Sequence, residues 1–132
     1  MLTLSEYHEI DKSLKQVSDT WSDLWVCLHH LPIGISRLIA LRYTAITEME
    51  LIIEIYPDGR RDVITLPDKF QRIIHRRRRS YPEDIYIFQS HSNRVKAKKK
   101  PVTLIAFNSA IKRAALGVTR KVVSSGSARI LS

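Results

Sequence analysis

Cysteine, glycine and long apolar runs are scarce in this chain of 132 residues, and each shortage excludes a class of protein. Cys27 is the only cysteine, which excludes an internal disulfide and a zinc site built from clustered cysteines. The four glycines do not form a phosphate-binding loop, and no Ser-His-Asp signature is present. No apolar run reaches the ~18 residues of a membrane span, and the chain does not open with a basic-then-apolar leader. We therefore expect a cytoplasmic protein without a membrane partner.

Acidic residues are absent after Asp84, whereas ten lysines or arginines follow it. Residues 1–58 carry four basic and nine acidic side chains (−5), and residues 59–132 carry eighteen basic and four acidic ones (+14), which gives the net charge of +9. Such a one-sided positive field attracts a polyanion, and nucleic acid is the commonest one that a cytoplasmic protein meets. Solubility and binding to acidic proteins are the alternative uses of a basic face.

Hydrophobic periodicity predicts a mainly helical first third. Between residues 3 and 29, apolar side chains recur at the spacing of an amphipathic helix, at Leu14, Val17, Trp21, Leu24, Trp25 and Leu28. A polar stretch at 16–20 divides this region into two helices, with Ser18 or Asp19 as the N-cap. A further helix is expected at 36–43, after Pro32 and Gly34, with Ser36 as its cap.

The remaining pattern adds strands and further helices. The segments 48–56 and 61–66 are rich in β-branched residues, and Pro57-Asp58-Gly59 between them favours a hairpin turn. We expect a helix at 68–79, a short strand at 85–88, and a helix at 101–116 that ends at Gly117 in the left-handed conformation. The predicted fold is α+β: a mainly helical single domain, residues 1–132, with a small three-stranded antiparallel sheet. Acidic helices occupy 1–30 and a basic part occupies 31–132.

Four segments resemble the catalytic domain of the tyrosine recombinase (phage integrase) family. They read LPIGISRLIALRY at 31–43, IFQS at 87–90, PVTLIAFNSAIKRAALG at 101–117 and VSSGSAR at 123–129. The family pattern for the first segment is roughly Thr-Gly-Leu-Arg-Ile-Ser-Glu-Leu-Leu-Ala-Leu-Arg-Trp. Gly34 therefore occupies the position of the first catalytic arginine and Arg37 that of the glutamate. In the last segment, Gly126 occupies the histidine position and Arg129 that of the second arginine. The resemblance covers roughly residues 20–130.

The resemblance implies DNA as the partner, and its gaps argue against DNA cleavage. The family's chemistry uses arginines that hold the scissile phosphate in a planar fork, and Gly34 cannot do this. Arg60 and Arg61 lie where the family has a lysine acid, and arginine is too weak an acid to replace it. None of the five tyrosines (Tyr7, Tyr43, Tyr56, Tyr81 and Tyr86) matches the nucleophile, which the family places some tens of residues beyond its histidine-arginine box. We expect no enzyme activity.

The basic and amide side chains supply the candidate DNA contacts. The lysine-rich segment 90–100 suits phosphate tracking, and asparagine and arginine on the next helix can bond to base edges. The run Arg76 to Arg79 has two interpretations. It is either a solvated helix end whose cations interact favourably with the C-terminal end of the helix dipole, or a site where two of the four arginines hold phosphate. The predicted DNA-binding residues are Arg37, Arg42, Arg60, Arg61, Arg76, Arg94, Lys96, Lys98, Lys99, Lys100, Asn108, Lys112, Arg113, Arg120, Lys121 and Arg129.

Other residue types point to structural roles. Cys27 is expected to be a buried thiol and Tyr43 a core residue. His29 and His30 are adjacent, so they cannot chelate from one helix face, and we expect neither a metal nor a cofactor.

The sequence thus predicts a catalytically inactive, recombinase-like protein that binds double-stranded DNA as a regulator or accessory factor of a plasmid, phage or other mobile element. One alternative is an interaction protein that modulates an active recombinase or pairs with itself, using the acidic N-terminal helices. The other is a residual strand-transfer enzyme that another chain completes in trans.

Overall fold

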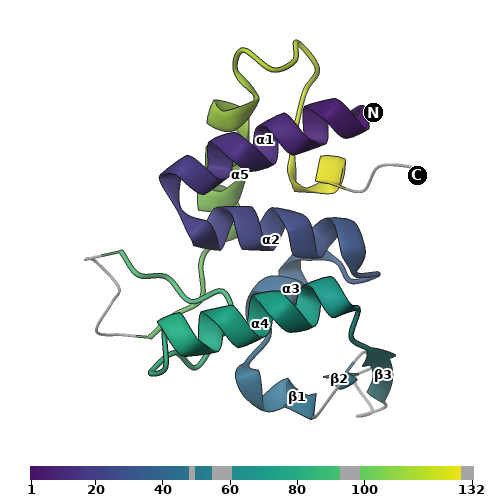
Figure 1. Ribbon diagram of the computed structural model, residues 1–132, viewed down its shortest axis with the longest axis vertical. Helices are drawn as coiled ribbons and strands as arrows, with labels where there is room; N and C mark the ends of the chain where they lie inside the picture. The colour runs from purple at the N-terminus through teal and green to yellow at the C-terminus, as the bar shows by residue number, and fades with distance from the viewer. Residues whose placement is uncertain (48–49, 55–60, 93–98, 129–132) are drawn as a thin grey trace.

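The computed structural model describes residues 1–47, 50–54, 61–92 and 99–128 (Figure 1). The fold is mainly helical, with short strands near one end. Its elements in chain order are α1 (Leu4–Val17), α2 (Asp19–His30), α3 (Ile35–Ala40), η1 (Tyr43–Ala45), β1 (Ile46–Thr47), β2 (Glu50–Glu54), β3 (Arg61–Thr65), α4 (Asp68–Ser80), α5 (Leu104–Ala115) and η3 (Ser125–Ala128). Among the described residues, no helix is long and apolar enough to cross a membrane.

Helix α2 lies at the centre of the molecule, between α1 and α5 on one side and α3 and α4 on the other (Figure 1). Its residues Ser22 to Leu28 are all buried, whereas α1 buries only one stripe. Ser18 ends α1 and caps α2: its backbone N–H donates to the Leu14 carbonyl at 2.9 Å, and its hydroxyl accepts from the Thr20 N–H at 3.2 Å. The predicted division of this region at Ser18 is confirmed. Cys27 is buried as predicted, and burial raises the pKa of its thiol.

Helix α3 is shorter than the predicted 36–43 helix. It begins at Ile35 with Gly34 as N-cap, so the expected Ser36 cap was wrong, and it ends at Ala40. The next residues pair with a distant segment instead of continuing the helix. Tyr43 donates its N–H to the Ile85 carbonyl at 3.0 Å, and the Leu41 carbonyl accepts the Ile87 N–H at 3.1 Å. Tyr43 itself is half-buried and packs against the core.

The strands form an antiparallel sheet in the order β1-β2-β3. In β2 and β3, Glu50 pairs with Thr65 and Glu54 with Arg61, so the hairpin lies where the sequence predicts it, and its turn lies outside the described residues. The predicted strand at 85–88 was wrong: Tyr86 makes only an isolated bridge to Arg42. The backbone N–H groups of Ile85 and Tyr86, which a strand would pair with a neighbouring strand, donate to the Gln89 Oε1 instead.

Helix α5 begins three residues later than predicted. Pro101 instead forms a bridge with Gln89, and the Val102 N–H donates to the Phe88 carbonyl at 2.9 Å. The Thr103 hydroxyl then caps the helix by accepting the Ala106 N–H at 3.1 Å. Gly117 follows the helix with φ of +83°, the left-handed conformation that the sequence predicts for it.

Candidate nucleic-acid interface

Arg77 is the most deeply buried charged side chain among the described residues, with 0% exposure. Its Nη1 lies 2.9 Å from the Asp23 Oδ2, its Nε donates to the Ile87 carbonyl at 2.8 Å, and its Nη2 donates to the Thr20 hydroxyl at 3.1 Å. The guanidinium also lies over the rings of Tyr81 and Phe88, at 5.2 and 5.5 Å. Arg77 thus joins α2, α4 and the segment after α4.

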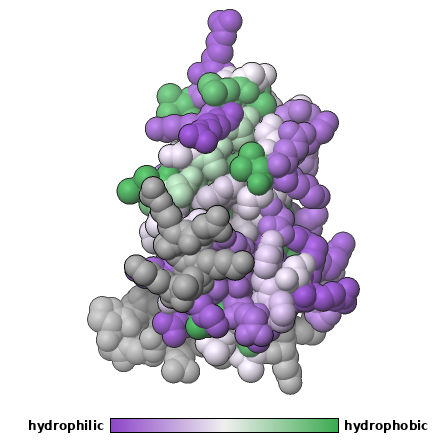
Figure 2. Space-filling view, turned by 90° about the vertical axis from the view of Figure 1, so that its left-hand side faces the viewer, coloured by the Kyte–Doolittle hydropathy of each residue, from purple (hydrophilic) through white to green (hydrophobic). Residues whose placement is uncertain are grey.

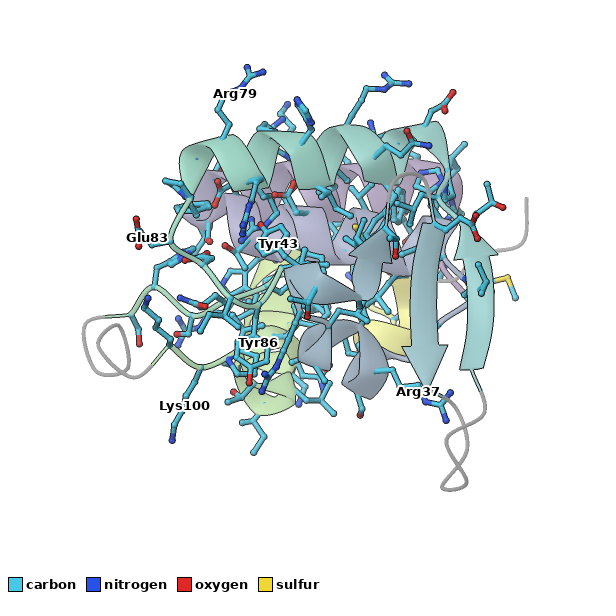
Figure 3. The ribbon with its side chains drawn as sticks, turned by 90° about the horizontal axis from the view of Figure 1, so that it is seen from below. Arg37, Tyr43, Arg79, Glu83, Tyr86 and Lys100 are labelled. Atoms are coloured by element: carbon cyan, nitrogen blue, oxygen red, sulfur yellow. The ribbon has the colours of Figure 1, made fainter. Side chains whose placement is uncertain are left out.

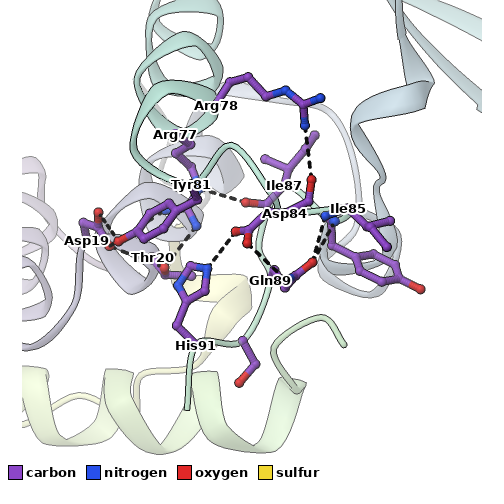
Figure 4. Close-up of polar contacts among 12 residues, drawn as sticks. Asp19, Thr20, Arg77, Arg78, Tyr81, Asp84, Ile85, Ile87, Gln89 and His91 are labelled. Carbon is purple, nitrogen blue, oxygen red and sulfur yellow. Dashed lines mark hydrogen bonds and ion pairs between the residues drawn. The ribbon is translucent and has the colours of Figure 1, made fainter. Parts of the chain in front are cut away.

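The polar network around Arg77 fixes the segment 81–91 against the helices (Figure 4). The Tyr81 hydroxyl donates to the Asp19 carboxylate at 2.9 Å, and the Tyr81 ring stacks on His91 with centroids 4.1 Å apart. The His91 Nε2 lies 2.7 Å from the Asp84 Oδ2, and the Gln89 amide donates to the other oxygen of Asp84 at 3.0 Å. Each of these buried polar groups has a partner, as a well-defined structure requires.

The arginine run therefore divides into four environments. Arg76 is half-exposed and forms an ion pair with Asp23. Arg78 donates to the Asp84 carbonyl at 3.1 Å and lies over the Tyr43 ring at 4.6 Å, and Arg79 is exposed. Neither interpretation from the sequence, a solvated helix end or two arginines that hold phosphate, included the structural role of Arg77. The available signal was Asp23, a carboxylate within the apolar stretch of α2 that requires a buried partner.

Two predicted contact residues, Arg37 and Lys100, lie on one side of the molecule in Figure 3. Tyr86 is drawn between them, and Arg79 points away from the opposite side. Arg42 is next to Tyr86: its Nη2 donates to the Tyr86 hydroxyl at 3.1 Å, and its guanidinium lies 5.1 Å from the centre of that ring. Four further predicted basic residues are exposed. Lys99 precedes α5, Lys112 and Arg113 lie within it, and Arg120 follows it.

Two predicted contact residues hold other parts of the chain in place. The Asn108 Oδ1 accepts the Ser125 N–H at 3.0 Å, which ties η3 to α5. The Lys121 ammonium lies 2.7 Å from the Glu6 Oε1 and 2.8 Å from the Met1 carbonyl, so it ties the segment after α5 to α1. The bond from Lys121, with that from the Thr3 backbone, lowers the pKa of Glu6 to about 2. Contact of either residue with DNA stays a prediction.

The remaining predicted residues lie at or next to the undescribed parts of the chain. Arg61 begins β3, and its backbone pairs with that of Glu54. Five residues lie outside the described part of the chain: Arg60, Arg94, Lys96, Lys98 and Arg129.

The two glycines at the catalytic positions of the resemblance have ordinary backbone surroundings. A Cβ added at Gly34 would meet nothing within 4 Å, and one added at Gly126 would lie 3.9 Å from the Ser124 hydroxyl. The segment that carries Gly126 is docked on the C-terminal end of α2, where the His29 Nδ1 donates to the Ala128 carbonyl at 3.0 Å. The fold therefore has room for a Cβ at both positions.

Comparison with solved structures gives lambda integrase as a structural neighbour. The chain matches a lambda integrase dimer bound to a COC′ core site with a TM-score of 0.75 and a second such dimer with 0.74, each over 97% of its length. It matches a lambda integrase tetramer bound to a Holliday junction with 0.68 over 93%. The chain shares the fold of lambda integrase. This confirms, for the fold, the resemblance found in the sequence.

The likeness is one of structure. Sequence identity is 14% in all three comparisons, and the chain spans 38%, 48% and 35% of the lambda integrase chains. No family model matches the chain, and no curated protein matches it.

Proposed function

We propose that this chain binds duplex DNA without cutting it and acts as a regulator or accessory factor of a mobile element. The observation that carries the proposal is the match over 97% of the chain to integrase dimers that are bound to core-site DNA. The charge pattern supports it independently, because residues 59–132 carry an excess of fourteen positive charges. A polyanion is the partner that such a field attracts.

The first DNA surface in this proposal is the α3–α5 face, defined as Arg37, Arg42, Lys99, Lys100, Lys112 and Arg113. All six side chains are exposed. Arg42 is oriented by the hydroxyl and ring of Tyr86 and keeps further N–H donors for a phosphate, since a guanidinium has five. Lysines act there as mobile point charges that follow the phosphate backbone.

Loss of catalysis follows from the chemistry of the residues at the family positions. Gly34 offers no group to a phosphate oxygen, and Gly126 offers no imidazole. Removing one oriented group that stabilises a transition state typically costs on the order of 10²–10³ in rate. The contact surface is kept in this proposal, and the reaction is lost.

The test measures binding and cleavage on the same protein. Fluorescence anisotropy with a labelled duplex at low salt should show binding, and a suicide substrate should give no covalent adduct. The double variant Arg37→Ala/Arg42→Ala should weaken binding. Lys12→Glu, which changes the charge by the same amount on exposed α1, should change binding less. Absence of binding at low salt would remove the proposal, and an adduct lost on a Tyr→Phe change would overturn its inactive status.

Association with a recombinase or with a second copy is the alternative function. It is favoured by exposed apolar side chains over α5 and the segment after it, Ile105 (82%), Leu116 (78%) and Val122 (94%). Figure 2 shows such apolar patches beside hydrophilic surface. The integrase neighbours are themselves a dimer and a tetramer on DNA. Light scattering of the pure protein, and of its mixture with an integrase, tests this alternative. The same mixture with a suicide substrate tests strand transfer completed in trans.

A further inference from the structure

Helix α4 presents a second line of positive charge, on the side of the molecule away from the α3–α5 face. The α4 stripe consists of Lys69, Arg72, Arg76 and Arg79, all exposed. Their spacing of three, four and three residues keeps them on one side of an α-helix. At a rise of 1.5 Å per residue the stripe is about 15 Å long. In Figure 3, Arg79 projects from α4 on the side opposite Arg37 and Lys100.

Packing fixes the direction in which this stripe points. Phe70, Ile73 and Arg77 are the buried residues of α4, and they face α2 and the segment 81–91. Rotation of α4 would break the bonds from Arg77 to Asp23, Thr20 and the Ile87 carbonyl. The stripe is therefore held outward on a rigid element, so the backbone loses little conformational entropy when a ligand binds.

The stripe borders a shallow groove of about 400 Å³, lined by Gln71, Arg72, His75, Arg76 and Arg79. The lining contains no carboxylate among the described residues. Arg72 and Arg79 have no ion-pair partner in the described part of the chain.

A cleft of about 330 Å³ that shares Arg72 and Arg76 with this groove is lined by Asp11, Asp19 and Asp23, and also by Lys15 and Lys69. Each of these carboxylates already has a partner. Asp23 pairs with Arg76 and Arg77, Asp19 accepts from the Tyr81 hydroxyl, and Asp11 accepts from the Ser22 hydroxyl at 2.6 Å. Asp68 is exposed on α4 itself, and the four cations of the stripe exceed the acidic side chains of their own helix by three.

We propose that the α4 stripe binds a second DNA duplex, so that one molecule bridges two duplexes; this rests on the proposed function, in which the α3–α5 face holds the first. A line of cations about 15 Å long can lie along consecutive phosphates of one strand. Arg72 and Arg79 have no ion-pair partner in the described part of the chain, and the planar fork of an arginine can hold a phosphate with two hydrogen bonds. An acidic protein surface would have no need of this regular spacing.

The experiment separates binding of one duplex from bridging of two. Beads that carry an unlabelled duplex are incubated with the protein and a fluorescent duplex, and capture of the fluorescent duplex is measured. Anisotropy on the same proteins gives the affinity for a single duplex. The test variant is Arg72→Ala/Arg79→Ala. It removes two exposed charges and should leave α4 folded, because alanine has the highest helix propensity. Lys12→Glu is the control with the same change of charge.

The wild type and Lys12→Glu should capture the second duplex. The double variant should lose capture about tenfold or more while its affinity for one duplex falls less than about threefold, because each face contributes its own phosphate contacts.

Undiminished capture by the double variant would overturn the inference, as would a wild type that binds one duplex but captures no second. Equal loss of capture and single-duplex affinity would also overturn it, because α4 would then be the first DNA surface. Free DNA added to the mixture should reduce capture, and polyglutamate should not, if the α4 stripe is a nucleic-acid surface. An α4 stripe that binds only polyglutamate would overturn the inference. If the wild type binds no duplex at all, the proposed function fails, and this inference fails with it.

Discussion

Four consecutive arginines on α4 have four different surroundings, because successive residues of a helix point about 100° apart. Arg77 points towards α2 and pairs with Asp23, whose side chain is 6% exposed. Arg79, two residues on, lies in solvent. A buried ion pair is not in itself a source of stability, but removing one partner leaves an uncompensated charge in the interior.

Replacing Arg77 by alanine should therefore lower the free energy of unfolding by about 3–5 kcal/mol, the usual cost of breaking a buried pair. Asp23 would keep Arg76, which is the reason to expect the lower end of this range. Urea denaturation followed by circular dichroism measures the loss. Arg79→Ala is the matched control and should change stability by less than about 0.5 kcal/mol. Equal stability of the two variants would contradict the structural role assigned to Arg77.

Gly34→Arg should fold but should not create DNA cleavage. The added Cβ meets nothing within 4 Å, so we expect a loss of at most about 1 kcal/mol, from a poorer N-cap. One restored phosphate ligand leaves Gly126, which offers no imidazole, unchanged. Relaxation of supercoiled plasmid and adduct formation on a suicide substrate are the measurements. Cleavage by this single variant would contradict the proposal that the reaction is lost at several positions.

At the scale of elements, long-range backbone pairing changes what the local pattern predicts. The helix expected at 36–43 stops at Ala40, and the strand expected at 85–88 does not form. The two segments bond to each other instead, through Leu41 and Ile87 and through Tyr43 and Ile85. Each segment has a local pattern that fits a helix or a strand. In this fold, however, the bonds between the two segments satisfy their backbone N–H and C=O groups.

The lysine-rich segment before α5 should act as one phosphate-binding unit. Replacing Lys96, Lys98, Lys99 and Lys100 together by alanine should weaken binding to all duplex sequences alike, because lysines contact phosphates rather than base edges. Thermal unfolding should change little, since Lys99 and Lys100 are exposed. Anisotropy with two unrelated duplexes measures the effect. Unchanged affinity would show that the segment is only solvated, and loss confined to one duplex would show that it reads sequence.

At the scale of the whole molecule, the charge distribution sets the dependence of binding on salt. If about five phosphates are neutralised on the α3–α5 face, the logarithm of the affinity should fall against the logarithm of salt concentration with a slope of roughly −4 to −5. Anisotropy titrations at several salt concentrations give the slope. Arg37→Ala/Arg42→Ala should make it less steep by about 1.8. A flat response would exclude counterion release, and with it the proposed mode of binding.

The sequence alone determined much of the architecture and of the charge. Local features set the division of the first helices at Ser18, the β2–β3 hairpin, the helix after it and the left-handed Gly117, because caps, turns and periodicity act over a few residues. The recombinase resemblance gave the fold that the structural comparison supports. Most exposed candidates, such as Lys112 and Lys100, could be named because lysine and arginine side chains mostly lie at the surface of a protein.

Only the tertiary structure decided which charges face inward and which backbone segments pair. Arg77 meets Asp23 across 54 residues of sequence, and the Asn108 side chain meets the Ser125 backbone across 17. Lys100 and Arg79 also lie on opposite sides of the molecule only because α4 packs on α2 (Figure 3). Such contacts depend on how helices of similar local pattern pack together, and burial of one arginine in four is favourable only where the fold supplies a carboxylate and a carbonyl to receive it.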